Sequence, residues 1–275
     1  MTRALPWSRV ALTVGAAAAA SLTLFPIAWM VIVSLKTQRD ALALPPAWIF
    51  VPTFEAYAAV WAKGGFSRGF LNSLVTGAGT LAISLPLALM AAYALSRFKF
   101  RGDRAILYGM LVTRLFPPVA LVTPFFLTAT WLGVHDRTPT LVLAYAALNL
   151  PLAVWMLKGY FDAVPEELEQ SAMVDGATRL QAVTRVILPL MAPGLAATAV
   201  FVFVGAWNEF LFALTLTSRE ARTLPTVIAE FVGDTGIEWP QIMAASTIAL
   251  APVLIATFAL QRHIAAGMTA GAVKG

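Results

Sequence analysis

Side chains that commonly do covalent chemistry in enzymes are scarce in this chain. It has no cysteine and two histidines, His135 and His263, which lie in different predicted loops. No H-E-x-x-H or G-x-S-x-G sequence is present, so neither a zinc protease site nor a serine nucleophile is indicated. No G-x-x-x-x-G-K-[ST] loop occurs to hold ATP phosphates. We therefore predict no catalytic residue, metal site or cofactor in this chain.

Polar residues inside the apolar runs are the remaining candidates for a functional site. Arg114, Asn149 and Glu209 each interrupt such a run, and Trp207 and Asn208 directly precede Glu209. An ionisable side chain at bilayer depth is costly and usually faces protein or a water-filled cavity. We therefore predict that these five residues line a solute pathway or its gate. Two alternatives stay open: Arg114 reaches the inner headgroups, and the aromatic cluster beside Glu209 is an interfacial belt.

A polar stretch, residues 161–193, separates two apolar runs. Pro165 suits the first position of a helix, glutamates fill its first turn, and Gly176 can supply the left-handed turn that ends it. A second helix is predicted from near Thr178 until Pro189 helps to redirect the chain. Because a membrane span follows at each end, force applied to this elbow must reach both spans. We interpret it as a docking lever, the alternative being an ordinary amphipathic connector.

The spacing within this stretch resembles the EAA loop, E-A-A-x3-G-x9-I-x-L-P, of permease subunits of binding-protein-dependent ABC importers. Gly176, Leu188 and Pro189 agree with it, whereas Gln170 stands where that family usually has glutamate. The acidic role then falls to Glu169, one residue earlier. In that family the helix docks into a cleft on a cytoplasmic ATPase subunit, and the resemblance implies the same task here. It assigns ATPase coupling to Glu166, Glu167, Glu169, Gln170, Ser171, Ala172, Asp175, Gly176, Leu188 and Pro189.

Two further segments resemble one branch of that family. Residues 206–212 are similar to a fifth-span segment common among carbohydrate importers of the maltose, glycerol-phosphate and trehalose type. Residues 267–275 resemble the G-L-T-x-G-x-V-K-G terminus of maltose-type second permease subunits, with Met268 in place of leucine. In those relatives the tail reaches into the ATPase dimer, and a disordered glycine-rich end is the alternative. The resemblance implies ATPase contacts for Thr269, Gly271, Lys274 and Gly275.

The composition is that of a polytopic membrane protein. Of the 275 residues 59% are hydrophobic and 12% charged, and the mean hydropathy is +0.78. The net charge of +5 would suggest nucleic acid for a soluble protein. Here the basic residues flank apolar runs, so they indicate membrane topology and a lipid environment, with no nucleic-acid partner.

Six apolar runs are each long enough to cross roughly 30 Å of hydrocarbon as a helix. The first could also be a cleavable signal peptide, but it continues past a usual signal core, which favours an anchor. Prolines and Arg114 interrupt the third, so we expect a kinked helix there. The fold class is therefore all-α, a six-helix membrane protein, and the resemblance implies the type I ABC importer permease fold. The predicted segments are spans 10–35, 70–96, 105–131, 138–158, 195–216 and 242–260, the coupling loop 161–193 and the tail 261–275.

Lysine and arginine are more numerous in the proposed inner segments, and densest over residues 97–104. Basic residues favour the cytoplasmic side, so both termini are predicted to be cytoplasmic. The resemblance implies a bacterial inner membrane.

These observations favour a permease subunit of an ATP-driven ABC importer for a sugar or related polyol, and not an enzyme. The EAA-type helix would couple ATPase closure to alternating access. The implied partners are a second homologous permease, two ATPase subunits that bind ATP and Mg, and an extracytoplasmic substrate-binding protein. One alternative is a secondary transporter or channel driven by an ion gradient. It would need intramembrane relays, for which only Arg114 and Glu209 qualify. A membrane enzyme is the third hypothesis.

Overall fold

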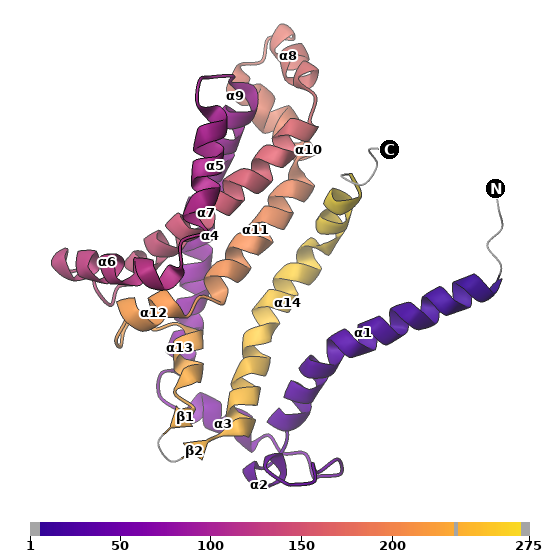
Figure 1. Ribbon diagram of the computed structural model, residues 1–275, viewed down its shortest axis with the longest axis vertical. Coiled ribbons are helices and arrows are strands. Elements are labelled where there is room, and N and C mark those ends of the chain that lie inside the picture. The colour runs from indigo at the N-terminus through magenta and orange to yellow at the C-terminus, as the bar shows by residue number, and fades with distance from the viewer. Residues whose placement is uncertain (1–5, 234–235, 271–275) are drawn as a thin grey trace. The chain divides into compact units, whose positions relative to one another are not determined.

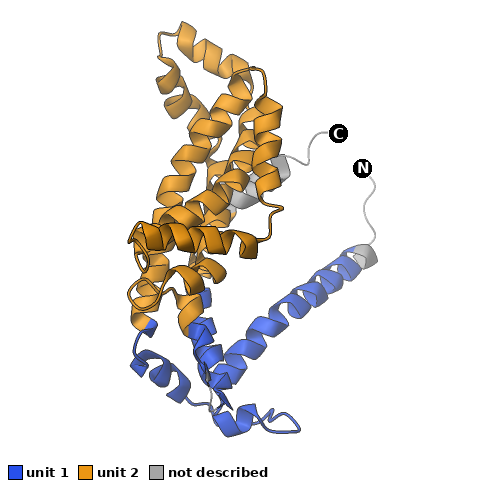
Figure 2. Ribbon diagram, turned by 60° about the vertical axis from the view of Figure 1, so that its left-hand side comes forward, with its two compact units in different colours: residues 1–66, 228–251 blue, residues 67–227, 252–275 orange. Residues whose placement is uncertain are grey.

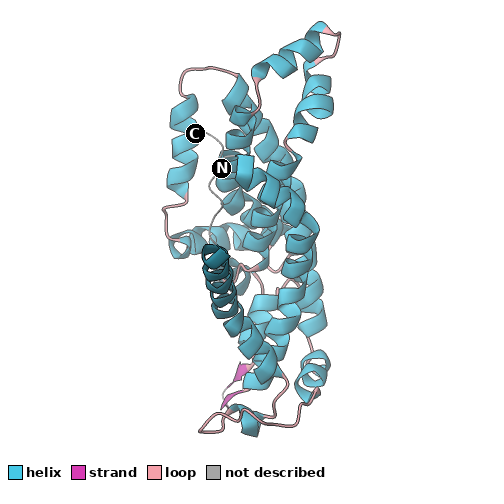
Figure 3. Cartoon of the chain, turned by 90° about the vertical axis from the view of Figure 1, so that its right-hand side faces the viewer, coloured by secondary structure: helices cyan, strands magenta, loops and turns pink. Residues whose placement is uncertain are grey.

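Most of the chain is helical. A computed structural model describes residues 6–233 and 236–270, where the strands are confined to one antiparallel hairpin, β1 with β2 (Figure 3). Figure 1 labels most of these elements. In chain order they are α1 Pro6–Ser34, α2 Gln38–Ala41, α3 Glu55–Ala62, α4 Phe66–Arg97, α5 Asp103–Thr113, α6 Pro118–Trp131, α7 Thr138–Ala163, α8 Glu166–Val174, α9 Arg179–Ala182, the π-helix η1 Val183–Ile187, α10 Leu188–Leu190, α11 Ala192–Trp207, α12 Leu211–Leu216, α13 Leu224–Ala229, β1 Val232–Gly233, β2 Gly236–Ile237 and α14 Trp239–Ala270.

The chain divides into two compact units (Figure 2). Unit 1 comprises residues 1–66 and 228–251, and unit 2 comprises residues 67–227 and 252–275. Unit 2 holds the coupling loop and every candidate pathway residue.

Within the described residues, four single helices are long and apolar enough to cross a membrane: Arg9–Ser34, Phe66–Arg97, Thr138–Ala163 and Trp239–Gln261. Two bent helix pairs pass the same test, which brings the number of candidate spans to six if each pair counts as one. This range agrees with the expected polytopic all-α architecture.

The expected third span, residues 105–131, is broken more sharply than a kinked helix. α5 and α6 meet at 91° across the residues between them. Pro117 and Pro118 lack the N–H groups that would continue the hydrogen bonding of α5. Arg114 closes α5 by donating its backbone N–H to the carbonyl oxygen of Leu111, 3.1 Å away. The prolines thus produce two separate helices.

The expected fifth span, residues 195–216, is also two helices. α11 ends at Trp207 and α12 begins at Leu211. The carboxylate of Glu209 accepts the backbone N–H groups of Phe212 at 2.9 Å and Ala213 at 3.1 Å. A side chain that satisfies the first free N–H groups of a helix favours a helix start at that point.

The core of unit 2 lies where α4, α7 and α11 pack together. Leu157 and Phe161 of α7, Ala92 of α4 and Ile187 of η1 are buried in one apolar cluster. Gly194 lets α11 approach α7 closely, because a Cβ atom there would lie 2.3 Å from the ring of Tyr160. These contacts fix the two spans that flank the coupling loop.

In unit 1, a buried lysine organises the segment after α1. The ammonium group of Lys36 donates to the carbonyl oxygen of Ala47 at 2.7 Å, and the residue is 3% exposed. It also lies 5.1 Å from the ring centre of Trp29 and 5.0 Å from that of Phe50. Cation–π contacts of this kind stabilise a desolvated ammonium group.

Candidate coupling elbow and polar cavity

The elbow has the local structure that its sequence predicts. Pro165 lies one position before the first residue of α8, whereas the sequence predicts it at the first helical position. Gly176 has a φ of +93°, the left-handed conformation that glycine adopts without strain. Thr178 then starts α9 through a capping box, with Gln181 Oε1 accepting the backbone N–H of Thr178 at 2.9 Å. We call residues 165–182 the elbow.

The helix after the elbow is irregular at the motif positions. α9 continues into the π-helix Val183–Ile187, followed by the short helix that carries Leu188 and Pro189. The segment Arg179–Leu190 bends by 79° against α11. π-helical turns widen a helix by one residue and are frequent at functional sites. The Leu188-Pro189 pair therefore lies at the bend between the elbow and the next membrane helix.

Glu169 faces inward, although the resemblance places it among the ATPase-coupling residues, and that role stays a prediction. Its carboxylate lies 3.3 Å from Nε of Arg97 and 3.8 Å from Nε of Arg179, and it accepts the hydroxyl hydrogen of Tyr93. The side chains of Arg97 and Glu169 are only 7% and 6% exposed. Removing one partner of a buried ion pair costs about 3–5 kcal/mol, because the other charge is left uncompensated. Glu169 therefore fixes α8 to the end of α4.

Further contacts fix the base of the elbow to the same end of α4. Arg97 Nη2 donates to the carbonyl oxygen of Val164 at 2.8 Å. Ser96 donates its hydroxyl to Asp162 at 2.6 Å, and Lys158 lies 2.7 Å from the other oxygen of that carboxylate. Val164, which caps the C-terminal end of α7, and the last turns of α7 are thus both bound to α4.

The outward face of the elbow is acidic. This face carries the exposed carboxylates of α8, that of its C-terminal cap Asp175, and the turn residue Gly176. α8 lies at one end of unit 2 (Figure 1). Val174, 86% exposed, adds an apolar group. Carboxylates in the first turn also suit the positive end of the helix dipole. The exposed members are Glu166, Glu167, Gln170, Ser171, Asp175 and Gly176, with Ala172 half-buried.

An open cavity within unit 2 brings three of the five predicted pathway residues together. Its volume is about 400 Å³, and Arg114, Asn149 and Glu209 line it. Trp207 is instead buried between Phe70 and Phe203, with ring centres 5.8 and 5.6 Å away. Asn208 is exposed and is not among the lining residues. The other lining residues are Thr113, Phe116, Pro118, Leu121, Phe125, Ala147, Leu148, Pro151, Gly205 and Phe212.

Two of the polar side chains that line the cavity also form hydrogen bonds with backbone groups. Glu209 caps α12, and Asn149 donates its side-chain N–H to the carbonyl oxygen of Tyr145 at 2.8 Å. Sequence reasoning missed Gly205, where a Cβ atom would lie 2.5 Å from Oδ1 of Asn149. No sequence pattern marks this close approach, because the two residues belong to different helices. The cavity thus combines an amide, a guanidinium and a carboxylate with apolar and aromatic walls.

Most of the predicted ATPase-contacting tail lies outside the described residues. Thr269 lies in α14, but its side chain and the residues Gly271, Lys274 and Gly275 lie outside the described residues. Where side chains are described, no cluster of three or more histidines and carboxylates is placed to hold a metal ion.

This architecture defines a polytopic helical membrane protein with a tethered acidic elbow and a polar cavity between spans. Residues 84–270 match the model of the family described as binding-protein-dependent transport system inner membrane component, and the chain belongs to that family. It is therefore a permease subunit of an ABC importer and not an enzyme, and the ion-driven alternative has no support.

Individual relatives cover nearly the whole chain. It is 39% identical over 258 residues to the trehalose transport system permease protein SugB of Mycobacterium tuberculosis, covering 92% of this chain and 93% of SugB. It is 38% identical over 271 residues to the trehalose/maltose transport system permease protein MalG of Thermococcus litoralis, covering 97% of each. A solved bacterial ABC transporter that imports alginate matches with a TM-score of 0.73 at 22% identity, covering 96% of this chain and 100% of that one. This likeness shows the fold.

Proposed function

We propose that this chain imports a sugar or related polyol, as one of two homologous permease subunits in the bacterial inner membrane. The names of the trehalose and maltose relatives support the substrate class. The cavity suits such a solute, because its amide and charged groups can hydrogen-bond hydroxyls while aromatic side chains contact the apolar faces of a sugar ring. Arg114 and Asn149 are the proposed solute contacts. Glu209 fixes the start of α12 beside them. A pathway or gate role for Trp207 and Asn208, which do not line the cavity, stays a prediction.

The elbow is the proposed docking element for one of two cytoplasmic ATPase subunits, which bind the ATP and Mg. The observation that carries this proposal is an acidic, exposed elbow whose base is fixed to α4 by the buried Glu169–Arg97 pair. Such an elbow can transmit a movement of the ATPase to the membrane spans, because its exposed face can bind the ATPase while its inner face is bound to α4. Closure of the ATPases would move both elbows and open the pathway to the other side.

Orientation follows from this assignment. The elbow faces the cytoplasm, and so do both termini, which the excess of basic residues over positions 97–104 supports. The tail residues Thr269, Gly271, Lys274 and Gly275 would contact the ATPase. A soluble extracytoplasmic protein would deliver the solute to the opposite face.

The proposal is tested by charge reversal on the exposed face of α8. The complex is purified with its ATPase and its second permease, and its composition and solute-stimulated ATP hydrolysis are measured. The double substitution Glu166→Lys and Glu167→Lys is expected to remove the ATPase from the purified complex while membrane insertion persists. Glu55→Lys reverses an exposed carboxylate in the first turn of α3 and serves as the matched control. Full ATPase retention by the double variant would contradict docking at α8.

A further inference from the structure

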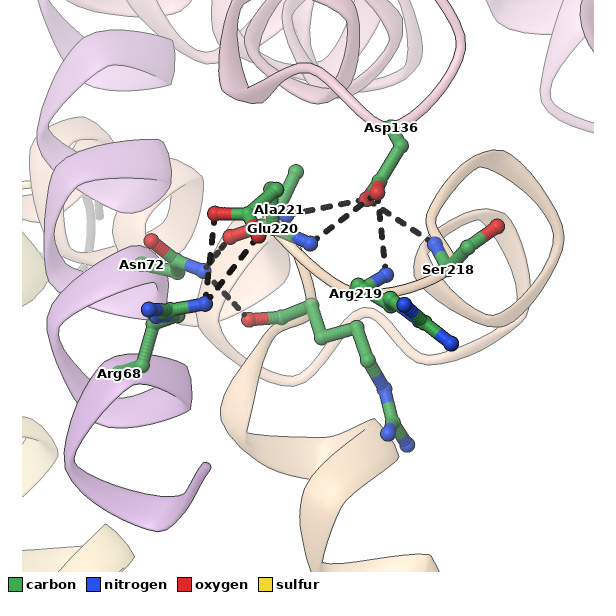
Figure 4. Close-up of polar contacts among 8 residues, drawn as sticks. Arg68, Asn72, Asp136, Ser218, Arg219, Glu220 and Ala221 are labelled. Carbon is green, nitrogen blue, oxygen red and sulfur yellow. Dashed lines mark hydrogen bonds and ion pairs between the residues drawn. The ribbon is translucent and has the colours of Figure 1, made fainter. Parts of the chain in front are cut away.

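A loop at the end of unit 2 opposite the elbow is held by an aspartate in an unusual way. The carboxylate of Asp136 accepts four backbone N–H groups in succession, from Ser218, Arg219, Glu220 and Ala221, at 3.0, 3.0, 3.1 and 3.0 Å (Figure 4). Asp136 itself has a φ of 57°, which turns its side chain toward this loop from the α6–α7 connection. We call residues 217–223 the clamped loop.

Helix α4 holds the clamped loop from a second side. Asn72 Nδ2 donates to the carbonyl oxygens of Glu220 at 2.7 Å and Arg222 at 2.9 Å. Arg68 Nη1 lies 3.3 Å from the carboxylate of Glu220 (Figure 4). The backbone N–H groups of residues 218–221 and the carbonyl oxygens of Glu220 and Arg222 are therefore paired, although the loop forms no helix or strand. An irregular segment with its backbone satisfied in this way is fixed rather than mobile.

Asp136 and Asn72 bind the loop through its backbone, and loop residues 218–220 remain exposed. The side chain of Arg219 extends away from Asp136 (Figure 4), and Arg219 and Arg137 are exposed. Arg68 is 59% exposed in its pair with Glu220, itself 73% exposed. Arg68 pairs with Glu220, Arg219 precedes Glu220 in the chain, and Arg137 directly follows Asp136. These three arginines outnumber the two carboxylates of Glu220 and Asp136, so the net charge of this surface is positive.

The position of this surface determines which kind of partner can reach it. Asn72 binds the clamped loop and Arg97 binds the elbow, and both belong to α4. At about 1.5 Å per residue, their separation along the helix is about 38 Å, which exceeds the roughly 30 Å of bilayer hydrocarbon. The clamped loop therefore lies on the membrane face opposite the elbow. On that face a cytoplasmic ATPase cannot contact it.

We propose that Arg68, Arg137 and Arg219, arranged around the clamped loop, form a basic docking surface for an acidic patch of the soluble substrate-binding protein. Asp136 is the positioning residue of this surface. The proposal rests on the proposed function, because it assumes a soluble partner on the outer face. A loop that is already ordered loses little conformational entropy on binding, and charge complementarity steers the encounter.

The test uses the complete importer in lipid nanodiscs with the binding protein that sustains its transport. ATP hydrolysis is measured against binding-protein concentration at two salt concentrations. Arg219→Glu is expected to raise the half-saturating concentration by about tenfold at low salt and by less at high salt. Asp136→Asn is expected to raise it as well, although it leaves the three arginines in place. Arg39→Glu reverses another exposed arginine, in the segment between α1 and α4, and should change nothing.

The outcomes separate this inference from the proposed function. An unchanged half-saturating concentration for Arg219→Glu, in a complex that still responds to the binding protein, overturns the docking surface alone. A wild-type complex whose ATP hydrolysis responds to no binding protein overturns the proposed function together with it. Asp136→Glu lengthens the side chain and keeps its charge. Failure of both Asp136→Asn and Asp136→Glu to alter the half-saturating concentration would remove Asp136 from the positioning role.

Discussion

Asn72 and Arg97 stand at opposite ends of α4, and each donates hydrogen bonds to backbone carbonyl oxygens of a segment outside that helix. Asn72 holds Glu220 and Arg222 of the clamped loop, and Arg97 holds Val164 at the base of the elbow. A side chain that binds backbone atoms fixes a segment whatever side chains that segment carries. The clamped loop and the elbow are therefore both bound to α4. A displacement of one of them is transmitted through that helix to the other.

Loss of Arg97 should uncouple the elbow from α4. In Arg97→Gln the buried carboxylate of Glu169 loses its 3.3 Å partner, and we expect the free energy of unfolding to fall by about 3 kcal/mol. Thermal unfolding in detergent measures this loss. The matched control is Lys158→Gln, because the Lys158–Asp162 pair is more exposed and should contribute less than about 1 kcal/mol.

A double variant distinguishes the ion pair from general damage. Adding Glu169→Gln to Arg97→Gln removes the uncompensated charge, so the double variant should be more stable than Arg97→Gln alone. Additive losses would show that the two side chains act independently.

The turn glycine of the elbow should not tolerate a side chain. Gly176→Ala places a Cβ atom on a residue with a φ of +93°, which costs about 1–2 kcal/mol. Gly159→Ala in α7 is the matched control, because a Cβ atom there meets no atom within 4 Å and alanine favours a helix by about 0.5–1 kcal/mol. We expect the first variant to lose ATPase association and the second to keep it. Equal association of the two variants would contradict a fixed turn at Gly176.

The sequence predicts local features of the elbow better than its contacts. Gly176 and the capping residue Thr178 are local signals, and both occupy the predicted roles. The direction of Glu169 was not predictable, because Arg97 belongs to another helix, far away in sequence. Three glutamates in one helical turn look alike until the position of the neighbouring helix is known.

The membrane spans show the same contrast. The apolar runs predict where helices lie, because hydropathy is a property of the local sequence. Their breaks depend on particular polar contacts. The break after Trp207 occurs where the Glu209 carboxylate caps α12. From the sequence alone, a carboxylate in an apolar run is as compatible with a partner elsewhere in the bundle as with a helix cap.

The close approach of Gly205 to Asn149 should be essential to the cavity wall. In Gly205→Ala the new Cβ atom would lie 2.5 Å from Oδ1 of Asn149, so the amide must move and its hydrogen bond to Tyr145 weakens. We expect a loss of about 1–3 kcal/mol in unfolding free energy, and a lower transport rate. Gly109→Ala is the control, because a Cβ atom there contacts nothing within 4 Å.

The collision itself can be tested by removing the amide. In the double variant Gly205→Ala with Asn149→Ala, the space that Asn149 occupied is free. Its stability should therefore exceed the sum expected from the two single variants. A strictly additive result would show that Gly205→Ala acts through some other contact.

Acid should loosen the clamped loop in a window set by Asp136. Burial favours the neutral carboxyl, but the backbone N–H groups of Ser218, Ala221, Glu220 and Arg219 outweigh it and lower the pKa from 3.8 to about 2. A carboxyl whose pKa is lower in the folded protein stabilises the fold above its unfolded pKa. That stabilisation is complete above about pH 4 and is lost as the pH falls toward 2.

Asp136→Asn removes this titration, since an amide accepts fewer of the four N–H groups and carries no charge. We expect the variant to lose about 1–3 kcal/mol at pH 7, and the gap to wild type to narrow below pH 4. Thermal unfolding of the purified subunit between pH 7 and pH 3 measures both. Glu55→Gln, which neutralises an exposed carboxylate in α3, serves as the control and should leave the wild-type pH profile unchanged. A gap that stays constant from pH 7 to pH 3 would mean that the charge of Asp136 does not hold the loop.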